Sequence, residues 1–210
     1  MALTQEQIVK LVDLLKSKDQ EFVQQGMILT ETLIYDEPEF LNLFKGLTTY
    51  PIPQNPSFQT IQQTFQRAQI DGTALFERAT QNLLSCWCLG MLAQWNTAII
   101  LETTTVDLSD SQLHTLPSIL QRLTQLQSLD LHRNHLQHLP TWLGDLPDLR
   151  ELNVSKNPLR SLPTNIRTLR IDDDQWTTLQ AELWSLHSLR HLDLQDCVIK
   201  HIPWTIQNLT

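Results

Sequence analysis

The sequence predicts an α/β chain in which an α-helical region precedes a solenoid of five coils with a curved parallel sheet. Three observations lead to this fold class. A leucine pattern recurs through the second half of the 210-residue chain, each copy contains the apolar alternation of a strand, and the first half shows capped helical periodicity. The predicted boundaries are 1–98 for the helical region and 99–210 for the solenoid.

The recurring pattern is L-x-x-L-x-L-x-x-N-x-L-x-x-L-P, and its best copy runs from Leu126 to Pro140. Inside this copy, Leu129-Asp130-Leu131 alternates as in a strand with one buried face. One coil cannot bury its own leucines, so stacked coils are expected to share a continuous core. The copies are spaced 23, 23, 17 and 23 residues apart and begin at Thr103, Leu126, Leu149, Ile166 and Leu189.

Over residues 101–210 this pattern resembles the leucine-rich repeat family. The Leu-Pro pair that closes most copies, as in Leu139-Pro140, looks like the bacterial and intracellular varieties. The resemblance implies a non-enzymatic scaffold that recognises a protein or peptide on the surface of its strands. The residues agree with this reading, because a rigid array that displays variable side chains in rows suits recognition.

The position held by Asn134 and Asn157 in the best copies is expected to turn inward. There a side-chain amide can satisfy backbone groups at the bend. Trp176 takes a leucine position of the weakest copy and is expected in the core. Other residues occupy the inward position in the remaining copies, where looser turns are expected: Ser111, Asp174 and Cys197.

The first half of the chain predicts helices. We expect three helices within residues 1–46, a proline-containing linker at 47–60, and helices at 61–98 that cover the first strand of the solenoid. A second recognition surface on these helices is the alternative. The predicted N-caps of the first three helices are Thr4, Asp19 and Asp36.

The composition excludes several classes of function. A formal charge of −8 argues against nucleic acid and anionic membrane surfaces as partners, and no apolar run is long enough to span a bilayer. The closest of the five glycines are 18 residues apart, so no phosphate-binding loop or dinucleotide motif can be written, and no cofactor is expected. Three cysteines do not make a disulfide framework, which favours a reducing cytoplasm.

The outward residues of the strands supply the candidate binding surface. By the register of the repeat, they form rows with eight carboxylates against three basic groups, which favours a basic partner protein or peptide. A solvated surface that only keeps the protein soluble is the alternative. The candidate partner-binding residues are Asp107, Asp110, Asp130, His132, Arg133, Glu151, Asn153, Lys156, Arg170, Asp172, Asp173, His191, Asp193 and Asp196.

Other constellations do not predict a metal or catalytic site. His132, His135 and His138 are expected on different sides of one coil, so they should not converge on a metal ion. Cys86 and Cys88 form a C-x-C pair on a predicted helix, where they point in different directions and fill the core. No residue is predicted to be catalytic.

Two other functions stay open. Trp204, Ile206 and Leu209 follow the last copy with no capping helix, which predicts self-association through the C-terminal end as a structural or assembly role. An enzyme activity in the helical half is the third hypothesis, and it would need a pocket with clustered titratable residues around 60–98.

Overall fold

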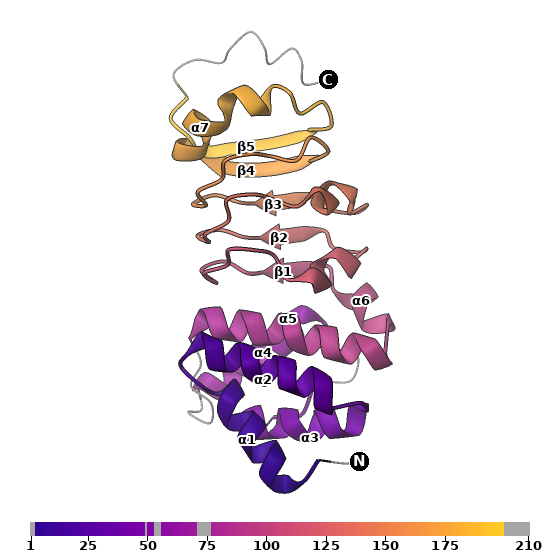
Figure 1. Cartoon of the computed structure of the whole chain (residues 1–210). Coiled ribbons are helices and arrows are strands. Elements are labelled where there is room, and N and C mark those ends of the chain that lie inside the picture. The colour runs from indigo at the N-terminus through magenta and orange to yellow at the C-terminus, as the bar shows by residue number, and fades with distance from the viewer. Residues whose placement is uncertain (1–2, 49, 53–55, 71–76, 200–210) are drawn as a thin grey trace. The chain divides into compact units, whose positions relative to one another are not determined.

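The computed structural model of the chain describes residues 3–48, 50–52, 56–70 and 77–199. The chain divides into two compact units, Met1–Glu102 and Thr103–Thr210, each with its own internal packing (Figure 1). None of the described helices is both long enough and apolar enough to cross a bilayer. The two units are described one after the other.

The described part of the N-terminal unit is helical. Helix α1 packs on α2 and α3, and α4 packs on α5. Aromatic side chains fill the space between helices, where Phe40 meets Trp87 edge-on at 5.6 Å and Phe44 meets Phe65 at 5.5 Å between ring centroids. The helices are α1 (Gln5–Leu15), α2 (Gln20–Leu33), α3 (Glu37–Thr48), α4 (Phe58–Ile70), α5 (Arg78–Trp95) and α6 (Ala98–Glu102).

The predicted N-caps of the first three helices are confirmed. Thr4 and Gln7 form a reciprocal capping box, in which the Thr4 hydroxyl accepts from the Gln7 amide at 3.3 Å and Gln7 Oε1 accepts from the Thr4 amide at 2.8 Å. Asp19 and Asp36 each accept a backbone amide bond at the start of the following helix. Local side-chain chemistry therefore sets where these helices begin.

The segment 47–60 contains more helix than predicted. Helix α3 extends to Thr48 and α4 begins at Phe58, so both enter the segment that was expected to be a linker. The hydroxyl of Ser57 accepts from the Thr60 amide at 3.3 Å, and the Phe58 side chain is fully buried. The buried ring of Phe58 and the capping hydroxyl of Ser57 explain why the helix starts two residues after Pro56, the last proline of the segment.

The C-terminal unit is built on a parallel sheet with strand order β1-β2-β3-β4-β5 (Figure 1). Asp107 pairs with Asp130, Asp130 with Asn153, Asn153 with Arg170, and Arg170 with Asp193. This register confirms the predicted repeat spacing, including its short 17-residue step. The strands are β1 (Thr105–Asp107), β2 (Ser128–Asp130), β3 (Glu151–Asn153), β4 (Thr168–Asp172) and β5 (His191–Asp196).

The aliphatic residues of the repeat line up in one continuous core, as predicted. Each inward-facing residue of β1 to β4 and of the positions just after these strands is at most 2 % exposed. In β5 the matching Leu192 and Leu194 are only half-buried, because β5 is the edge strand. The fully buried set is Val106, Leu108, Leu129, Leu131, Leu152, Val154, Leu169 and Ile171.

A second ladder of polar groups runs through the core beside the aliphatic one. Asn157 Nδ2 donates to the carbonyl oxygens of Leu131 and Val154 at 2.8 and 2.9 Å, so it joins the preceding coil to its own. Asn134 makes the equivalent bonds to Leu108 and Leu131. These bonds satisfy carbonyls that the turn would otherwise leave buried and unpaired, which is the inward role predicted for the two asparagines.

The fourth coil differs from the prediction. Instead of an irregular turn it contains α7 (Asp173–Leu183), which begins directly after β4. The expectation that Asp174 turns inward was wrong: Asp174 is exposed in the first turn of α7, and Gln175 takes the inward position. Trp176 is buried as predicted and meets Trp184 edge-on at 5.6 Å between ring centroids.

The short step between the third and fourth coils depends on one glycine. The side-chain amide of Asn165 donates to the carbonyl of Thr141 at 2.9 Å and to Asp145 Oδ1 at 2.8 Å. This brings Asn165 against the 3₁₀ helix Thr141–Asp145 so closely that a Cβ on Gly144 would overlap its backbone oxygen and side chain. The absence of a side chain at Gly144 therefore permits the shortened repeat.

Candidate binding surface

The central row of the sheet surface consists of the paired residues Asp107, Asp130, Asn153, Arg170 and Asp193. Its aspartates and asparagine are oriented by hydrogen bonds in turns at the strand ends. Oδ1 of Asp130 accepts from the backbone amide two residues on at 2.8 Å, and Asp107 and Asp193 each accept the equivalent bond at 2.9 Å. Asn153 makes the same contact through its amide oxygen at 3.2 Å. One oxygen of each side chain is thus engaged in structure, which an aspartate or an asparagine can do equally well.

A hollow of 550 Å³, here called the strand hollow, lies across β2 to β5. Its acidic groups are Asp130, Glu151 and Asp193, and its basic groups are Arg150 and Arg170, with the imidazole of His191 among them. The remaining lining residues are uncharged: Ser128, Leu129, Leu152, Asn153, Thr168, Leu169 and Gln195.

A second hollow of 680 Å³, here called the rim hollow, lies just beyond the carboxyl ends of the first three strands. Asp110, Arg133 and Lys156 occupy equivalent places in successive coils and share a left-handed backbone conformation, with φ values of 52°, 54° and 59°. The lining residues are Asp110, Gln112, His132, Arg133, Asn134, His135, Lys156 and Pro158.

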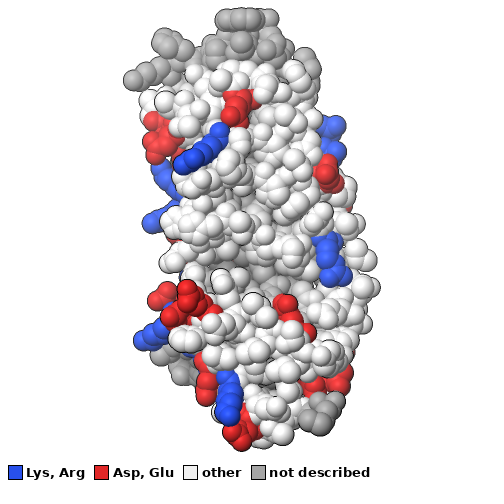
Figure 2. All heavy atoms as spheres, in the orientation of Figure 1, with Lys and Arg blue, Asp and Glu red and all other residues white. Residues whose placement is uncertain are grey.

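The three predicted basic groups of this surface each lie near a carboxylate. Arg133 Nε is 3.1 Å from Asp110 Oδ1, and Arg170 Nε is 3.8 Å from Asp193 Oδ2. The ammonium of Lys156 is 3.8 Å from Asp172 Oδ2. Exposed ion pairs of this kind add little stability, so their main effect is to orient the basic side chains. On the face shown in Figure 2, acidic and basic side chains also lie in small groups separated by uncharged surface.

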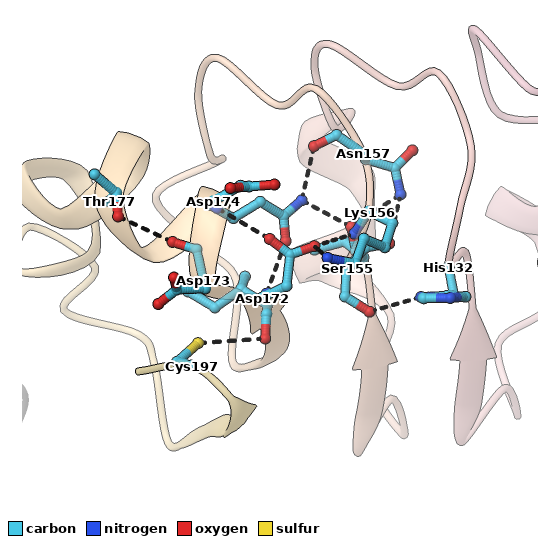
Figure 3. Close-up of polar contacts among 12 residues, drawn as sticks. His132, Ser155, Lys156, Asn157, Asp172, Asp173, Asp174, Thr177 and Cys197 are labelled. Carbon is cyan, nitrogen blue, oxygen red and sulfur yellow. Dashed lines mark hydrogen bonds and ion pairs between the residues drawn. The ribbon is translucent and has the colours of Figure 1, made fainter. Parts of the chain in front are cut away.

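Asp172 does not lie on the open surface, contrary to the prediction. Its side chain is 2 % exposed, because it caps α7 by accepting from the Gln175 amide at 3.1 Å (Figure 3). Its other oxygen accepts from the backbone amide of Lys156. In the earlier coils the equivalent amide bonds a carbonyl of the next coil, as the Arg133 amide does with Ser155 at 3.0 Å. The Asp172 carboxylate therefore replaces a backbone acceptor where the coil turns into a helix.

The remaining predicted acidic residues differ in exposure. Asp173 is half-buried, and its Oδ1 accepts from the Val198 amide at 2.8 Å. Glu151 and His191 are exposed on the strand surface, as expected. The side chain of Asp196 lies outside the described part of the structure.

The histidines are held apart in ordinary contacts. His132 Nδ1 lies 2.9 Å from the hydroxyl of Ser155, and His138 bonds the Ser161 hydroxyl one coil on at the same distance. His135 instead stacks on His114 at 5.2 Å between ring centroids. Across the described ranges, no three His, Cys, Asp or Glu side chains gather as metal ligands.

The two cysteines of α5 are buried core residues. Burial raises the pKa of the Cys86 thiol well above its usual range. Burial also raises the pKa of the Cys88 thiol, and the nearby Cys86 raises it further by a smaller amount. Both therefore remain protonated thiols at neutral pH, which is the opposite of what a nucleophile requires. Cys197 fills the inward position of the last coil, where its sulfur lies 3.7 Å from the carbonyl oxygen of Ile171.

The prediction from sequence missed some lining residues. Arg150 stands one residue before β3 and so fell outside the alternating strand pattern, yet it lines the strand hollow. His135 and Pro158 follow the strand ends and reach the rim hollow only because the chain turns there. The left-handed turns carry no glycine that would have marked them.

The geometry of the C-terminal unit defines a class of protein: a parallel solenoid whose coils are joined by an inward amide ladder. Comparison with protein families agrees. Residues 102–159 match the model described as leucine rich repeat, and residues 188–209 match a second leucine rich repeat model. The C-terminal unit is therefore a leucine-rich repeat array, a class whose curved surfaces serve in protein recognition.

Solved structures similar to the chain include two internalins of Listeria monocytogenes. Internalin C2 is 22 % identical with a TM-score of 0.36, over 53 % of this chain and 60 % of that one. The internalin inlF is 14 % identical with a TM-score of 0.24, over 58 % of each chain. The chain thus spans about 60 % of the internalin C2 chain. Because both TM-scores are low, the family assignment rests on the repeat models and the strand register. The comparison with curated proteins found no match.

Proposed function

We propose that this protein is a non-enzymatic, cytoplasmic recognition module that binds another protein or peptide in the strand hollow. The observation that carries the proposal is the hollow itself, a 550 Å³ depression lined in register by polar side chains from four adjacent strands. Three of these strands, β2 to β4, are anchored from below by fully buried aliphatic side chains, so their polar groups are displayed with little freedom to rearrange. Rigid display of this kind favours specific binding.

The partner is expected to offer basic groups to β2 and β3. Asp130 and Glu151 lie on these neighbouring strands with Arg150 one residue before β3, whereas Arg170 lies further along the sheet beside Asp193. A lysine or arginine of the partner would therefore meet two carboxylates and one guanidinium at one end of the strand hollow, and one of each at the other. Complementary charge of this kind fixes orientation and speeds association.

The test should change charge without breaking the turns. Reversing the charge of Asp130 would also remove the acceptor of the His132 amide, and Asp172 is a buried cap, so neither reversal is clean. Asn153 shows that an asparagine closes the same turn, so Asp130→Asn removes the charge and keeps the acceptor of the His132 amide, at the loss of the bond from Asn153 Nδ2 to Asp130 Oδ2 at 3.3 Å. Combined with Glu151→Gln, it removes two charges from the strand hollow alone.

The experiment is affinity capture with quantitative mass spectrometry, followed by titration calorimetry with the captured partner. The Asp130→Asn, Glu151→Gln variant should lose the partner and bind it about tenfold or more weakly, with a smaller dependence on salt. Asp174→Asn is the matched control, because it neutralises an exposed carboxylate outside both hollows. Equal binding by the wild type and the double variant would place recognition elsewhere.

A second candidate function is assembly through the edge strand β5. The specific observation is that Leu192 and Leu194 are half-buried, and Val198 and Ile199 just beyond them are 68 % and 39 % exposed. An apolar edge strand can pair with a second copy of the chain. Light scattering over a range of concentrations should then show dimers that Val198→Glu disperses. A single monomeric species at every concentration would rule this candidate out.

A further inference from the structure

The rim hollow differs from the strand hollow in the kind of hydrogen-bonding group that lines it. Its charged and imidazole side chains are two cations, Arg133 and Lys156, two histidines, His132 and His135, and a single carboxylate, Asp110. Donor-rich surroundings are unexpected in a chain with a formal charge of −8. No residue is shared between the two hollows, so the rim hollow is a separate surface.

The backbone places the two cations side by side. The Arg133 amide donates to the carbonyl of Ser155 in the next coil at 3.0 Å, and the Lys156 amide donates to the Asp172 carboxylate in the coil after that. Both residues have a left-handed backbone conformation, so their side chains leave the chain in the same sense from adjacent coils. Strands one step apart are separated by about 4.8 Å. Arg133 Nε lies against Asp110 of the preceding coil and the Lys156 ammonium lies nearest Asp172 of the following coil, so a bound anion would draw these two flexible side chains of the same hollow together.

Much of the donor capacity in the rim hollow is unused. Arg133 meets Asp110 through Nε at 3.1 Å, and within the described residues its two terminal nitrogens have no hydrogen-bond partner. The Lys156 ammonium lies 3.8 Å from Asp172, beyond hydrogen-bond distance, and the Asp172 oxygens already accept two backbone amides. His132 uses only Nδ1, on Ser155.

We infer that the rim hollow binds an oxyanion carried by a partner molecule, either a carboxylate or a phosphate group. The terminal nitrogens of Arg133 form a planar fork that matches two oxygens of such a group, and Asp110 fixes the guanidinium from its Nε side. Lys156 supplies a second charge from the adjacent coil. The imidazoles of His132 and His135 complete the lining.

The test is NMR titration of the isotopically labelled full chain with inorganic phosphate and, separately, with acetate, at constant ionic strength set by chloride. Saturable shifts are expected at the Arg133 side chain and at the imidazoles of His132 and His135. Tighter binding of phosphate would identify a phosphoryl group as the ligand, and tighter binding of acetate a carboxylate. Shifts that grow linearly with either anion, without saturation, would overturn the inference.

Matched variants separate binding from damage to the fold. Arg133→Gln and Lys156→Gln should each weaken anion binding by about tenfold. Glutamine is compatible with this backbone, because Gln112, two residues after Asp110, already adopts a left-handed conformation with φ 54°. Arg160→Gln, which removes an exposed cation of the third coil outside the rim hollow, should leave binding unchanged.

A gain of affinity gives the sharpest test. Asp110→Asn keeps an oxygen that can accept from Arg133 Nε but removes the negative charge beside the bound anion, so it should strengthen anion binding by about threefold. Misfolding cannot produce a gain, and asparagine tolerates the left-handed conformation well. Unchanged affinity in both Asp110→Asn and Arg133→Gln would overturn the inference. This result is independent of the strand hollow, so it leaves the proposed protein partner untouched.

Discussion

The side-chain amide of Gln175 donates to the carbonyl oxygen of Val154 at 2.8 Å. One coil earlier, Asn157 makes the equivalent bond to Leu131. Gln175 belongs to a helix and Asn157 to a turn, yet both deliver an amide nitrogen to the same place in the stack. The longer glutamine side chain compensates for the different path of the backbone, so the inward ladder continues through the irregular fourth coil. The central row therefore keeps its pairing as far as Arg170 and Asp193, and the register shifts only after it, between Arg170 and Asp172.

Loss of the ladder amide should destabilise the solenoid strongly. Asn157→Ala leaves the amide of Leu136 buried without its acceptor. It also removes one of two side-chain donors from the carbonyls of Leu131 and Val154, which keep Asn134 and Gln175, so the change should cost about 1–3 kcal/mol. Urea unfolding followed by circular dichroism measures the change. The exposed Gln137→Ala, one coil earlier, is the control and should stay within about 0.5 kcal/mol of wild type. A small effect of Asn157→Ala would show that water replaces the amide.

Replacing the cap of α7, Asp172, by alanine should destabilise the protein more than replacing it by asparagine. Asp172→Ala removes the acceptor of both the Gln175 and the Lys156 amides and should lower stability by about 1–2 kcal/mol. Asp172→Asn keeps a capping oxygen and should cost less. Hydrogen exchange at the first turn of α7 measures the local effect, and equal exchange rates in the two variants would contradict the capping role.

The short repeat step should not tolerate a side chain at its crossing point. Gly144→Ala places a Cβ against the backbone oxygen of Asn165, which cannot move without breaking its bonds to Thr141 and Asp145, so a loss of about 1–3 kcal/mol is expected. Gly46→Ala is the comparison variant, because its Cβ would overlap a side chain and not a backbone atom, coming within 2.7 Å of Val12 Cγ2. Thermal unfolding should show a larger loss for Gly144→Ala than for Gly46→Ala.

The cysteines should react in a fixed order. At mildly alkaline pH, iodoacetamide should modify the half-buried Cys197 in the folded protein, and Cys86 and Cys88 only after unfolding in urea. Mass spectrometry of tryptic peptides identifies the sites. Rapid alkylation of Cys86 in the folded chain would contradict its burial.

The same burial predicts a dependence of stability on pH. The raised pKa values of Cys86 and Cys88 mean that the folded chain keeps both protons while the unfolded chain loses them near pH 9.0. Stability of the helical unit is therefore complete below pH 9.0 and falls as the pH rises above it. A Cys86→Ala, Cys88→Ala variant should show a flatter fall in urea unfolding experiments above that pH.

Local patterns in the sequence determined the repeat, the strand register and the helix caps. The inward asparagines and the central row from Asp107 to Asp193 could be placed from a period of 23 residues with one short step, because each coil repeats the same neighbours. The caps at Thr4 and Asp19 follow from residues three or fewer positions apart. Contacts over such short separations depend only on neighbouring residues, so the sequence alone predicts them.

Only the tertiary structure decided the fourth coil and the two hollows. Asp172 became a buried cap because α7 begins there, and Gln175 replaced Asp174 in the ladder for the same reason. The rim hollow brings together Arg133 and Lys156, 23 residues apart, through left-handed turns without glycine. Periodicity fixes which residues share a row, but the path between rows depends on how side chains from different coils compete for the same backbone groups. Which side chain bonds which backbone group is determined only when the coils stack.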